Sequence, residues 1–313
     1  MKTVFMGTPE IAAPVLEALL EAGHEVVSVH TRPDRPAGRG KRRTASPVKE
    51  YALERGLPVF QPASLRTGAA QMELAELSPE LIVVAAYGLF LPSAVLSLPP
   101  LGCLNVHPSL LPRYRGPSPV AAAILSGDAT TGVTVIKLDE GMDSGPIVAR
   151  RETEIGPEEN AEGLAARLFR LGAQVLVEVL PDWAAGRLQA IPQDKTLATT
   201  TRLLSREDGE IDWDLGAVRI ARQVRAYHPW PGAYTRWQGK QLKIIEASAW
   251  DAADAAPARP GRVVSLPSGG LGIAASEGVL QIRRIQLEGR RAAAVREFVW
   301  GYPEFVGSMV GEK

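Results

Sequence analysis

The sequence predicts an α/β protein in which a doubly wound parallel sheet is followed by a small OB-like β-barrel. The chain opens with a strand at Thr3–Met6, a helix from Pro9 to about Ala22 and a strand at Glu25–His30, which is a β-α-β start. Glu80–Ala86 is an almost continuous apolar run, typical of a central parallel strand. Several short strands between 233 and 286, separated by Gly and Pro, indicate the small barrel.

The length of 313 residues favours two domains. We expect the first domain to cover residues 1–185, because a helix with an apolar stripe runs from about Ala161 to Leu180. Residues 186–204 are polar, Thr-rich and without periodicity, and are interpreted as a linker. The second domain then covers residues 205–313.

The remaining elements follow from caps and apolar runs. Thr8 is expected to cap the first helix, and Ser46 and Ser64 to cap the next two, which end near Arg55 and Glu76. Further strands are expected at Leu57–Phe60, Gly132–Leu138 and Ile147–Ile155. In the second domain the expected strands are Ala233–Trp237, Gln241–Ser248, Gly261–Leu266, Leu271–Ala275 and Val279–Gln286, with a closing helix at Val295–Trp300.

The composition limits the classes of function. The chain has 35 Lys and Arg against 35 Asp and Glu, so nucleic-acid binding has to use local patches. The single cysteine excludes an internal disulfide and a cysteine-rich zinc site, the four histidines are scattered, and no metal is expected. The turn after the first strand, GTPE, is not a dinucleotide fingerprint.

The amino terminus does not have the shape of a signal peptide, and the longest apolar run, Leu81–Pro92, is shorter than the roughly 20 residues that span a bilayer. We therefore expect a cytoplasmic protein, and a monomer.

One stretch, Leu101–Pro146, carries the candidate chemistry. Alternation along a strand places Asn105 and His107 on one face, and Asp143 stands between glycines after the next strand. An amide and a protonated imidazole stabilise the oxyanion that forms when a carbonyl is attacked, and an Asp–His pair manages protons. The sequence therefore predicts acyl-type transfer at the ends of two strands.

Other interpretations of these residues remain open. A lone His after a strand often caps a turn, and an Asp between glycines is often a turn residue. Cys103 faces the same way as Asn105, but a lone Cys in a strand is more often a small buried hydrophobe. No Ser or Cys is clearly placed as a nucleophile, so we infer direct transfer between two bound substrates.

The block Asn105-x-His107-x-Ser109-Leu110-Leu111-Pro112, followed by Asp143, resembles the folate-dependent formyltransferases. These enzymes move a formyl group from 10-formyltetrahydrofolate to an amine. The resemblance implies that Asn105, His107 and Asp143 are catalytic and that the turn Ser109, Leu110, Leu111 and Pro112 belongs to the folate site. It also implies that Tyr87 and Gly88, in a segment similar to the family's AYG-x-x-LP, border the pterin pocket.

A basic run, Thr31–Pro47, contains six cations and one acid, Asp34. It is either a solvated surface loop or a finger that contacts a phosphate backbone. It resembles a loop of the family branch that formylates methionyl-tRNA, which implies tRNA contacts by Arg35, Arg39, Lys41, Arg42 and Arg43.

The second domain carries a further similarity to that branch, the segment RAYHPWPGAYT. Each cation there taken alone is more often a plain surface charge. The candidate RNA contacts are Arg222, Arg225, Arg236, Lys240 and Lys243, and His228 is expected to be structural.

The resemblance implies transfer of the formyl group to the α-amine of initiator methionyl-tRNA, giving N-formylmethionyl-tRNA for translation initiation. One alternative is a formyltransferase that acts on a small amine, glycinamide ribotide or an amino sugar. Another is an RNA-binding protein whose α/β domain has lost its activity. The basic run argues against the former, and the presence of Asn105, His107 and Asp143 argues against the latter.

Overall fold

The computed structural model describes residues 1–37, 42–250, 258–267 and 269–311. Contacts between residues divide the chain into two compact units. The first unit contains residues 1–119, 130–154 and 165–201, and the second contains residues 120–129, 155–164 and 202–313. Each unit has its own hydrophobic core.

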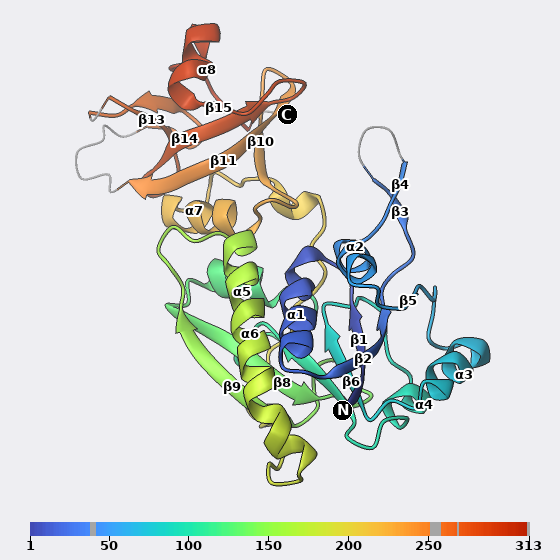
Figure 1. Ribbon diagram of the computed structural model, residues 1–313. Helices are drawn as coiled ribbons and strands as arrows, with labels where there is room; N and C mark the ends of the chain where they lie inside the picture. Colours follow the sequence, from blue (N-terminus) through green and yellow to red (C-terminus); the bar gives the residue numbers. More distant parts are fainter. Residues whose placement is uncertain (38–41, 251–257, 268, 312–313) are drawn as a thin grey trace. The chain divides into compact units, whose positions relative to one another are not determined.

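A seven-stranded sheet forms the centre of the first unit, in the order β5-β2-β1-β6-β7-β8-β9 (Figure 1). The strands are β1 (Lys2–Gly7), β2 (Glu25–His30), β5 (Val59–Phe60), β6 (Leu81–Ala85), β7 (Cys103–His107), β8 (Thr130–Lys137) and β9 (Ile147–Glu154). The five from β5 to β7 are parallel, which confirms the predicted class, whereas β8 and β9 are antiparallel additions. Strand direction is not encoded in apolar runs, so the sequence did not indicate this change.

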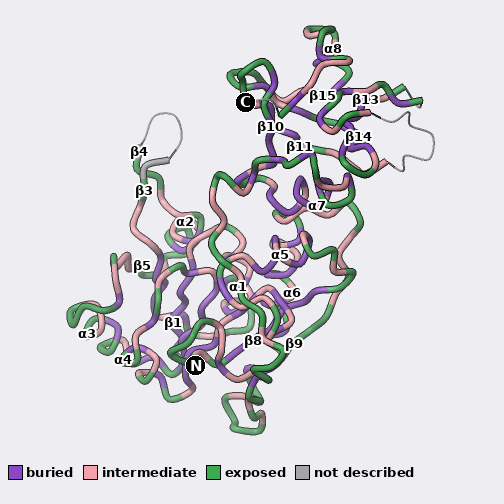
Figure 2. The backbone as a smooth tube through the Cα atoms, turned by 180° about the vertical axis from the view of Figure 1, so that it is seen from behind, coloured by how far each residue is buried: buried purple, intermediate pink, exposed green. Residues whose placement is uncertain are grey.

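Helices cover both faces of this sheet. Phe5, Val83 and Leu104 on one face belong to a core shared with α1 (Ala13–Glu21), α2 (Pro47–Glu54) and the later part of α6 (Ala161–Ala184). Met6 and Val84 on the other face share a core with α3 (Gly68–Glu76) and α4 (Ser93–Leu96). Figure 2 shows inner strands such as β1 in the buried colour, and β6 is buried along its whole length between these layers, which is why it is apolar throughout.

Two predicted helix starts were wrong, and one was confirmed. Thr8 does not cap a helix: a 3-10 turn, η1 (Glu10–Ala12), precedes α1, and the Thr8 hydroxyl donates to the Tyr87 carbonyl at 2.9 Å. Ser64 accepts only the Arg66 amide, and Thr67 caps α3 instead. The cap at Ser46 is confirmed, because its hydroxyl accepts the Lys49 amide. Local composition does not decide between neighbouring hydroxyl residues.

The basic run forms a hairpin, β3 (Arg35–Ala37) paired with β4 (Arg42–Thr44), which is a separate two-stranded sheet. The periodicity of this segment did not predict strands, since prolines and glycines interrupt it.

The second unit has an antiparallel sheet in the order β10-β11-β14-β13-β12, with β15 paired to β14 (Figure 1). This confirms the predicted small β domain. The strands are β10 (Ala233–Trp237), β11 (Lys240–Trp250), β12 (Val263–Ser265), β13 (Leu271–Ala274), β14 (Val279–Leu287) and β15 (Ala293–Ala294). The helices are α5 (Pro119–Ser126), α7 (Ala217–Ala226) and α8 (Val295–Gly301). The described residues of the chain also contain the 3-10 turns η2 (Lys195–Leu197), η3 (Glu207–Gly209) and η5 (Pro303–Phe305).

The core of the second unit joins α7 to the sheet through Ile220 and Val224. At its far side Trp237 makes edge contacts with Phe298 and Phe305, with ring centroids 5.8 and 5.2 Å apart. These aromatic contacts fix α8 and η5 against β10, because edge-to-face rings bury large apolar area in a defined geometry.

Candidate active site

Asn105, His107 and Asp143 meet in the first unit. The Asn105 amide donates from Nδ2 to Asp143 Oδ1 at 3.5 Å, and His107 Nδ1 lies 3.5 Å from Asp143 Oδ2. The same Oδ2 accepts the Gly116 amide at 2.8 Å. The carboxylate is thus held between the two β7 side chains and one backbone donor.

Both nitrogens of the buried His107 ring face acceptors. Nε2 lies 2.9 Å from the Tyr114 carbonyl, and Nδ1 faces the Asp143 carboxylate. A carbonyl and a carboxylate can only accept hydrogen bonds, so the doubly protonated ring alone offers a donor to each. The arrangement therefore suits an imidazolium that is 4% exposed and paired with a carboxylate.

Asp143 reaches this position by a route that the sequence did not predict. We expected the three side chains at the ends of two strands, but β8 runs antiparallel to β7, so its end at Lys137 lies beside Leu104. The following loop has to turn back along β7. Gly145 permits this turn, because a Cβ atom there would lie 1.9 Å from the Lys137 carbonyl oxygen.

The loop is braced by its own polar groups. The Asp139 carboxylate accepts the Gly141 amide at 3.0 Å and the Ser144 hydroxyl at 2.8 Å. Asp143 itself has φ 48°, in the left-handed region, which costs less for Asp than for most residues. The glycines around Asp143 therefore serve the folding of the loop.

Gln193 completes the cluster and was missed from the sequence. Its Nε2 donates to the carbonyls of Asp143 at 2.8 Å and Gly145 at 2.7 Å. Its Oε1 accepts from Arg115 Nε at 3.0 Å and Nη2 at 2.7 Å. Gln193 lies in the segment expected as a linker, where a polar, Thr-rich composition gave no signal of burial.

That segment makes further contacts with the first unit. The Thr199 hydroxyl accepts the Tyr114 amide at 2.8 Å, and the Thr201 amide donates to the Arg115 carbonyl at 2.7 Å. Residues up to Thr201 accordingly belong to the first unit.

The turn Ser109–Pro112 is stabilised internally. The buried Ser109 hydroxyl donates to the Arg113 carbonyl at 2.7 Å, and the Thr134 hydroxyl donates to the Ser109 carbonyl at 2.6 Å. Leu111 is buried, while Leu110 and Pro112 are half-buried. The polar groups of the turn thus hold its shape, and the Tyr114 carbonyl that follows it lies 2.9 Å from His107 Nε2.

Tyr87 and Gly88 follow β6 at its carboxyl end. Tyr87 is buried, and burial raises the pKa of its phenol. Gly88 is exposed with φ +78°, so its backbone is available to a ligand. Cys103 is buried, and burial raises the pKa of its thiol to about 12, which fits the interpretation as a small apolar side chain.

The residues of the basic run lie on the β3–β4 hairpin. Arg35 pairs with Thr44 and Pro36 with Arg43, and the Arg35 and Arg43 side chains are exposed. Arg42 lies in β4 opposite Ala37. Arg39 and Lys41 are outside the described residues.

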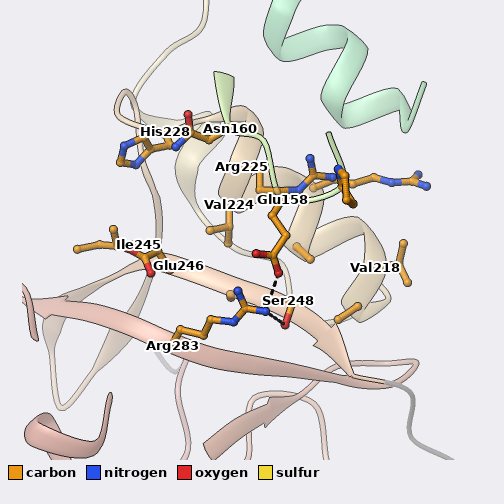
Figure 3. A pocket seen from close by; sticks show the side chains of 15 residues that line it. Glu158, Asn160, Val218, Val224, Arg225, His228, Ile245, Glu246, Ser248 and Arg283 are labelled. Atoms are coloured by element: carbon orange, nitrogen blue, oxygen red, sulfur yellow. Dashed lines mark hydrogen bonds and ion pairs between the residues drawn. The ribbon is translucent and has the colours of Figure 1, made fainter. Parts of the chain in front are cut away.

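The second unit contains a hollow of about 580 Å³ between α7, β11 and the segment around Glu158 (Figure 3). Figure 3 shows Arg283 directed at Glu158 and Ser248, with its Nη2 at 2.7 Å and 3.3 Å from their oxygens. Arg222 and Arg225, two of the predicted RNA contacts, line this hollow, and Arg225 Nη1 donates to the Glu159 carbonyl.

The other predicted cations of the second unit, Arg236, Lys240 and Lys243, lie on the β10–β11 hairpin. His228 faces Glu162, with Nε2 3.5 Å from a carboxylate oxygen. Within the described ranges no group of three or more His, Cys, Asp or Glu side chains could hold a metal ion. Nor does any helix in those ranges have the length and apolar character to cross a membrane.

Comparisons with known proteins give a consistent result. Residues 1–180 match the family model "Formyl transferase", and residues 203–303 match "Formyl transferase, C-terminal domain". The methionyl-tRNA formyltransferase of Chloroflexus aurantiacus is 54% identical over 79% of this chain and 80% of its own. That of a Roseiflexus species is 48% identical over 100% of this chain and 96% of its own.

Among solved structures, HypX from Aquifex aeolicus in complex with tetrahydrofolic acid superposes with a TM-score of 0.67. It is 19% identical and the match covers 98% of this chain and 48% of HypX, so it shows a shared fold.

Proposed function

This chain belongs to the formyl transferase family, and from that premise we propose that it moves the formyl group of 10-formyltetrahydrofolate to the α-amine of methionyl-tRNA. Relatives at 54% and 48% identity that cover most of the chain are methionyl-tRNA formyltransferases. The observation that carries the proposal is the cluster of Asn105, His107 and Asp143, which suits attack of an amine on an acyl carbon.

The transfer makes one bond and breaks another. The amine nitrogen of the methionyl group attacks the formyl carbon, and the formyl oxygen gains negative charge. Asn105 donates a hydrogen bond to that oxygen, and His107 supplies positive charge beside it. A donor aimed at developing charge contributes about 3 kcal/mol of transition-state stabilisation.

Two proton transfers accompany the formyl transfer. The attacking amine loses a proton, which Asp143 accepts through a water molecule, and the bond from the formyl carbon to N10 of the folate breaks as N10 gains a proton. The Asp143 carboxylate also lies 3.5 Å from His107 Nδ1 and orients the ring. The products are N-formylmethionyl-tRNA and tetrahydrofolate.

The donor site is proposed beside the exposed Gly88 backbone, with Tyr87 and Leu111 as its buried apolar support. A pocket with apolar walls and a few backbone hydrogen bonds suits a flat heterocycle. The Ser109–Pro112 turn contributes its shape, since its own polar groups are already bonded.

The acceptor tRNA is proposed to contact the hairpin through Arg35 and Arg43, with Arg39, Lys41 and Arg42 in the same run. Exposed cations on a protruding strand pair favour a phosphate backbone without reading bases. The proposal includes a cytoplasmic location and a monomer, which fractionation and ultracentrifugation test. It also includes domains at 1–185 and 205–313, with residues 186–201 packed on the first, which limited proteolysis tests.

The test is a formyl-transfer assay with 10-formyltetrahydrofolate and four acceptors: initiator methionyl-tRNA, uncharged tRNA, glycinamide ribotide and an amino sugar nucleotide. We expect product only with methionyl-tRNA. Formylation of a small amine with equal or greater kcat/KM, or none of methionyl-tRNA, would contradict the proposal.

A further inference from the structure

Arg32 stands at the carboxyl end of β2, where its backbone is fixed from two sides. Its amide donates to Thr8 Oγ1 at 3.3 Å, and its carbonyl accepts Gln61 Nε2 at 2.9 Å. Thr8 in turn donates to the Tyr87 carbonyl. The Arg32 side chain therefore starts from a rigid point that is tied to the ends of β1 and β6.

The one acid of the basic run is already used. Asp34 Oδ2 lies 2.7 Å from Lys49 Nζ, and Asp34 Oδ1 accepts Gln61 Nε2 at 2.7 Å. Lys49 also donates to Gln61 Oε1 at 2.8 Å, so the three side chains form a closed network. These contacts lower the pKa of Asp34, with the Lys49 hydrogen bond as the largest cause. Asp34 is thus committed to Lys49 rather than to Arg32.

The Arg32 guanidinium group lies beside Gly88 and Tyr87. A Cβ atom built on Gly88 would be 3.4 Å from Arg32 Cδ and 3.5 Å from Nη1, so the absence of a side chain there leaves the arginine its room. The Arg32 charge also opposes the rise that burial causes in the pKa of Tyr87.

Two buried polar atoms at this point have no partner among the described residues, Arg32 Nε and the Tyr87 hydroxyl. A buried donor without a partner costs free energy, and for a guanidinium the loss is larger because the group is charged. Both belong to residues that follow the carboxyl ends of strands, where open α/β sheets bind ligands, and an unpartnered guanidinium nitrogen fits a ligand with acceptor oxygens.

We propose that Arg32 binds an oxyanion of a substrate, with Tyr87 and the Gly88 backbone beside it. Arg presents a planar fork of donors that matches phosphate and carboxylate oxygens. The inference rests on the proposed function, which supplies two substrates with such oxygens. One source is the phosphate of the 3′-terminal nucleotide of tRNA, and the other is the glutamate carboxylate of the folate.

Both sources lie within reach. Neighbouring strands are about 4.8 Å apart, so β2 is roughly 14 Å from β7, and the Arg32 side chain covers much of that span by extending to Gly88 beyond β6. Eight covalent bonds join the α-amine of a methionyl ester to the 5′-phosphorus of its adenosine, on the order of 10 Å when extended. A glutamate carboxylate lies at a similar remove from the formyl group.

The experiment varies each oxyanion in turn. The acceptors are the 3′-methionyl esters of adenosine and of adenosine 5′-monophosphate, and the donors are 10-formyltetrahydrofolate and 10-formyltetrahydropteroate, which lacks glutamate. Wild type, Arg32→Gln and Arg32→Lys are compared, with Arg55→Gln as a control, because Arg55 is an exposed cation that stacks on Tyr51.

Arg32→Gln is expected to raise KM roughly tenfold for the substrate whose oxyanion Arg32 binds. KM for the analogue that lacks this oxyanion should stay unchanged. A change confined to the phosphate ester identifies tRNA as the source, and one confined to 10-formyltetrahydrofolate identifies the folate. Arg32→Lys should lose less than Arg32→Gln, and Arg55→Gln nothing.

The wild-type protein alone also decides the question if the variants fail to fold. Its kcat/KM should be higher for the ester of adenosine 5′-monophosphate than for that of adenosine, or higher for 10-formyltetrahydrofolate than for 10-formyltetrahydropteroate. Equal use of both members in both pairs would overturn the Arg32 site while leaving the proposed function intact. Failure to formylate the esters and methionyl-tRNA alike would remove the proposed function and, with it, this inference.

Discussion

Two inner strands of the central sheet, β2 and β7, each end in a histidine on the same face, and the two histidines have opposite environments. His107 on β7 has acceptors at both ring nitrogens, whereas His30 on β2 stacks on Phe60 with centroids 5.1 Å apart and has no described partner for either nitrogen. The register Met6↔His30, Met6↔Val84 and Val84↔Asn105 puts His30 in one row with the Asn105 amide. Both rings are buried, but their partners differ: His107 has an acceptor at each ring nitrogen, whereas burial lowers the pKa of His30 and favours its neutral form.

The two strands also differ in the segments that follow them. After β7 the chain turns back, and the Gly116 amide and Gln193 hold Asp143 in place beside the end of that strand. After β2 it extends into the hairpin with exposed Arg35 and Arg43. We infer that the residues near the end of β7 carry out the chemistry, and that the segment after β2 binds a charged substrate. Four predictions test this division.

The largest effect is expected on kcat when the β7 side chains are changed. Asn105→Ala and His107→Ala should each lower kcat by roughly 10²–10³, because each removes stabilisation of the developing oxyanion. Steady-state rates with methionyl-tRNA measure this, with the half-buried His24→Gln as a control for loss of a histidine. A near-normal kcat in either alanine variant would remove the mechanism.

The next effect concerns His30 and stability. Burial lowers the pKa of His30 to about 4, from 6.5 in the unfolded chain. Because the folded pKa is depressed, the contribution of neutral His30 is fully present above pH 6.5 and is lost as the pH falls through about 4. The difference amounts to roughly 3 kcal/mol.

His30→Phe should remove that pH dependence. Urea unfolding at pH 7 and pH 4 compares the two proteins, and the free energy of unfolding should fall less on acidification in the variant. Identical losses in wild type and variant would show that His30 does not titrate as a buried neutral group.

A smaller effect is expected at Gln193. Gln193→Leu removes the donor that holds the Asp143 and Gly145 carbonyls. Because the loop then no longer fixes Asp143, kcat should fall roughly tenfold. KM for methionyl-tRNA should change little. The control is Gln286→Leu, since that glutamine also donates to a backbone carbonyl, that of Arg290, at the surface. Equal kcat in both variants would mean that the loop holds Asp143 without Gln193.

The smallest effect is expected at the hairpin. Arg35→Gln and Arg43→Gln should each raise KM for methionyl-tRNA a few-fold and reduce the salt slope of tRNA binding by about 1, with kcat nearly unchanged. Arg55→Gln, at the residue that follows α2, serves as the matched exposed cation. Salt slopes equal to that of wild type would exclude these two arginines from the tRNA contact.

The same contrast explains what the sequence could predict. Parity along β7 correctly put Asn105 and His107 on one face, and apolar runs indicated the strands, because both depend only on local pattern. The direction of β8 and the return of its loop depend on pairing between distant segments, so the route of Asp143 was not foreseen. Gln193 acts through hydrogen bonds to backbone carbonyls 48 and 50 residues away, which no local signal marks.

The environment of Arg32 was also not predictable from the sequence. In the sequence it is one of several cations in a basic run, and only the structure separates it from them. It shows that Asp34 is bonded to Lys49 and Gln61, and that the Arg32 side chain turns to Gly88.

The central claim is that the Asp143 carboxylate makes His107 and Asn105 effective in formyl transfer. Rapid-quench single-turnover transfer from 10-formyltetrahydrofolate to methionyl-tRNA, with saturating wild-type protein or Asp143→Asn, tests it most directly. We predict that the variant binds both substrates with unchanged affinity and transfers the formyl group at least about 100-fold more slowly. A single-turnover rate equal to that of wild type would contradict the account.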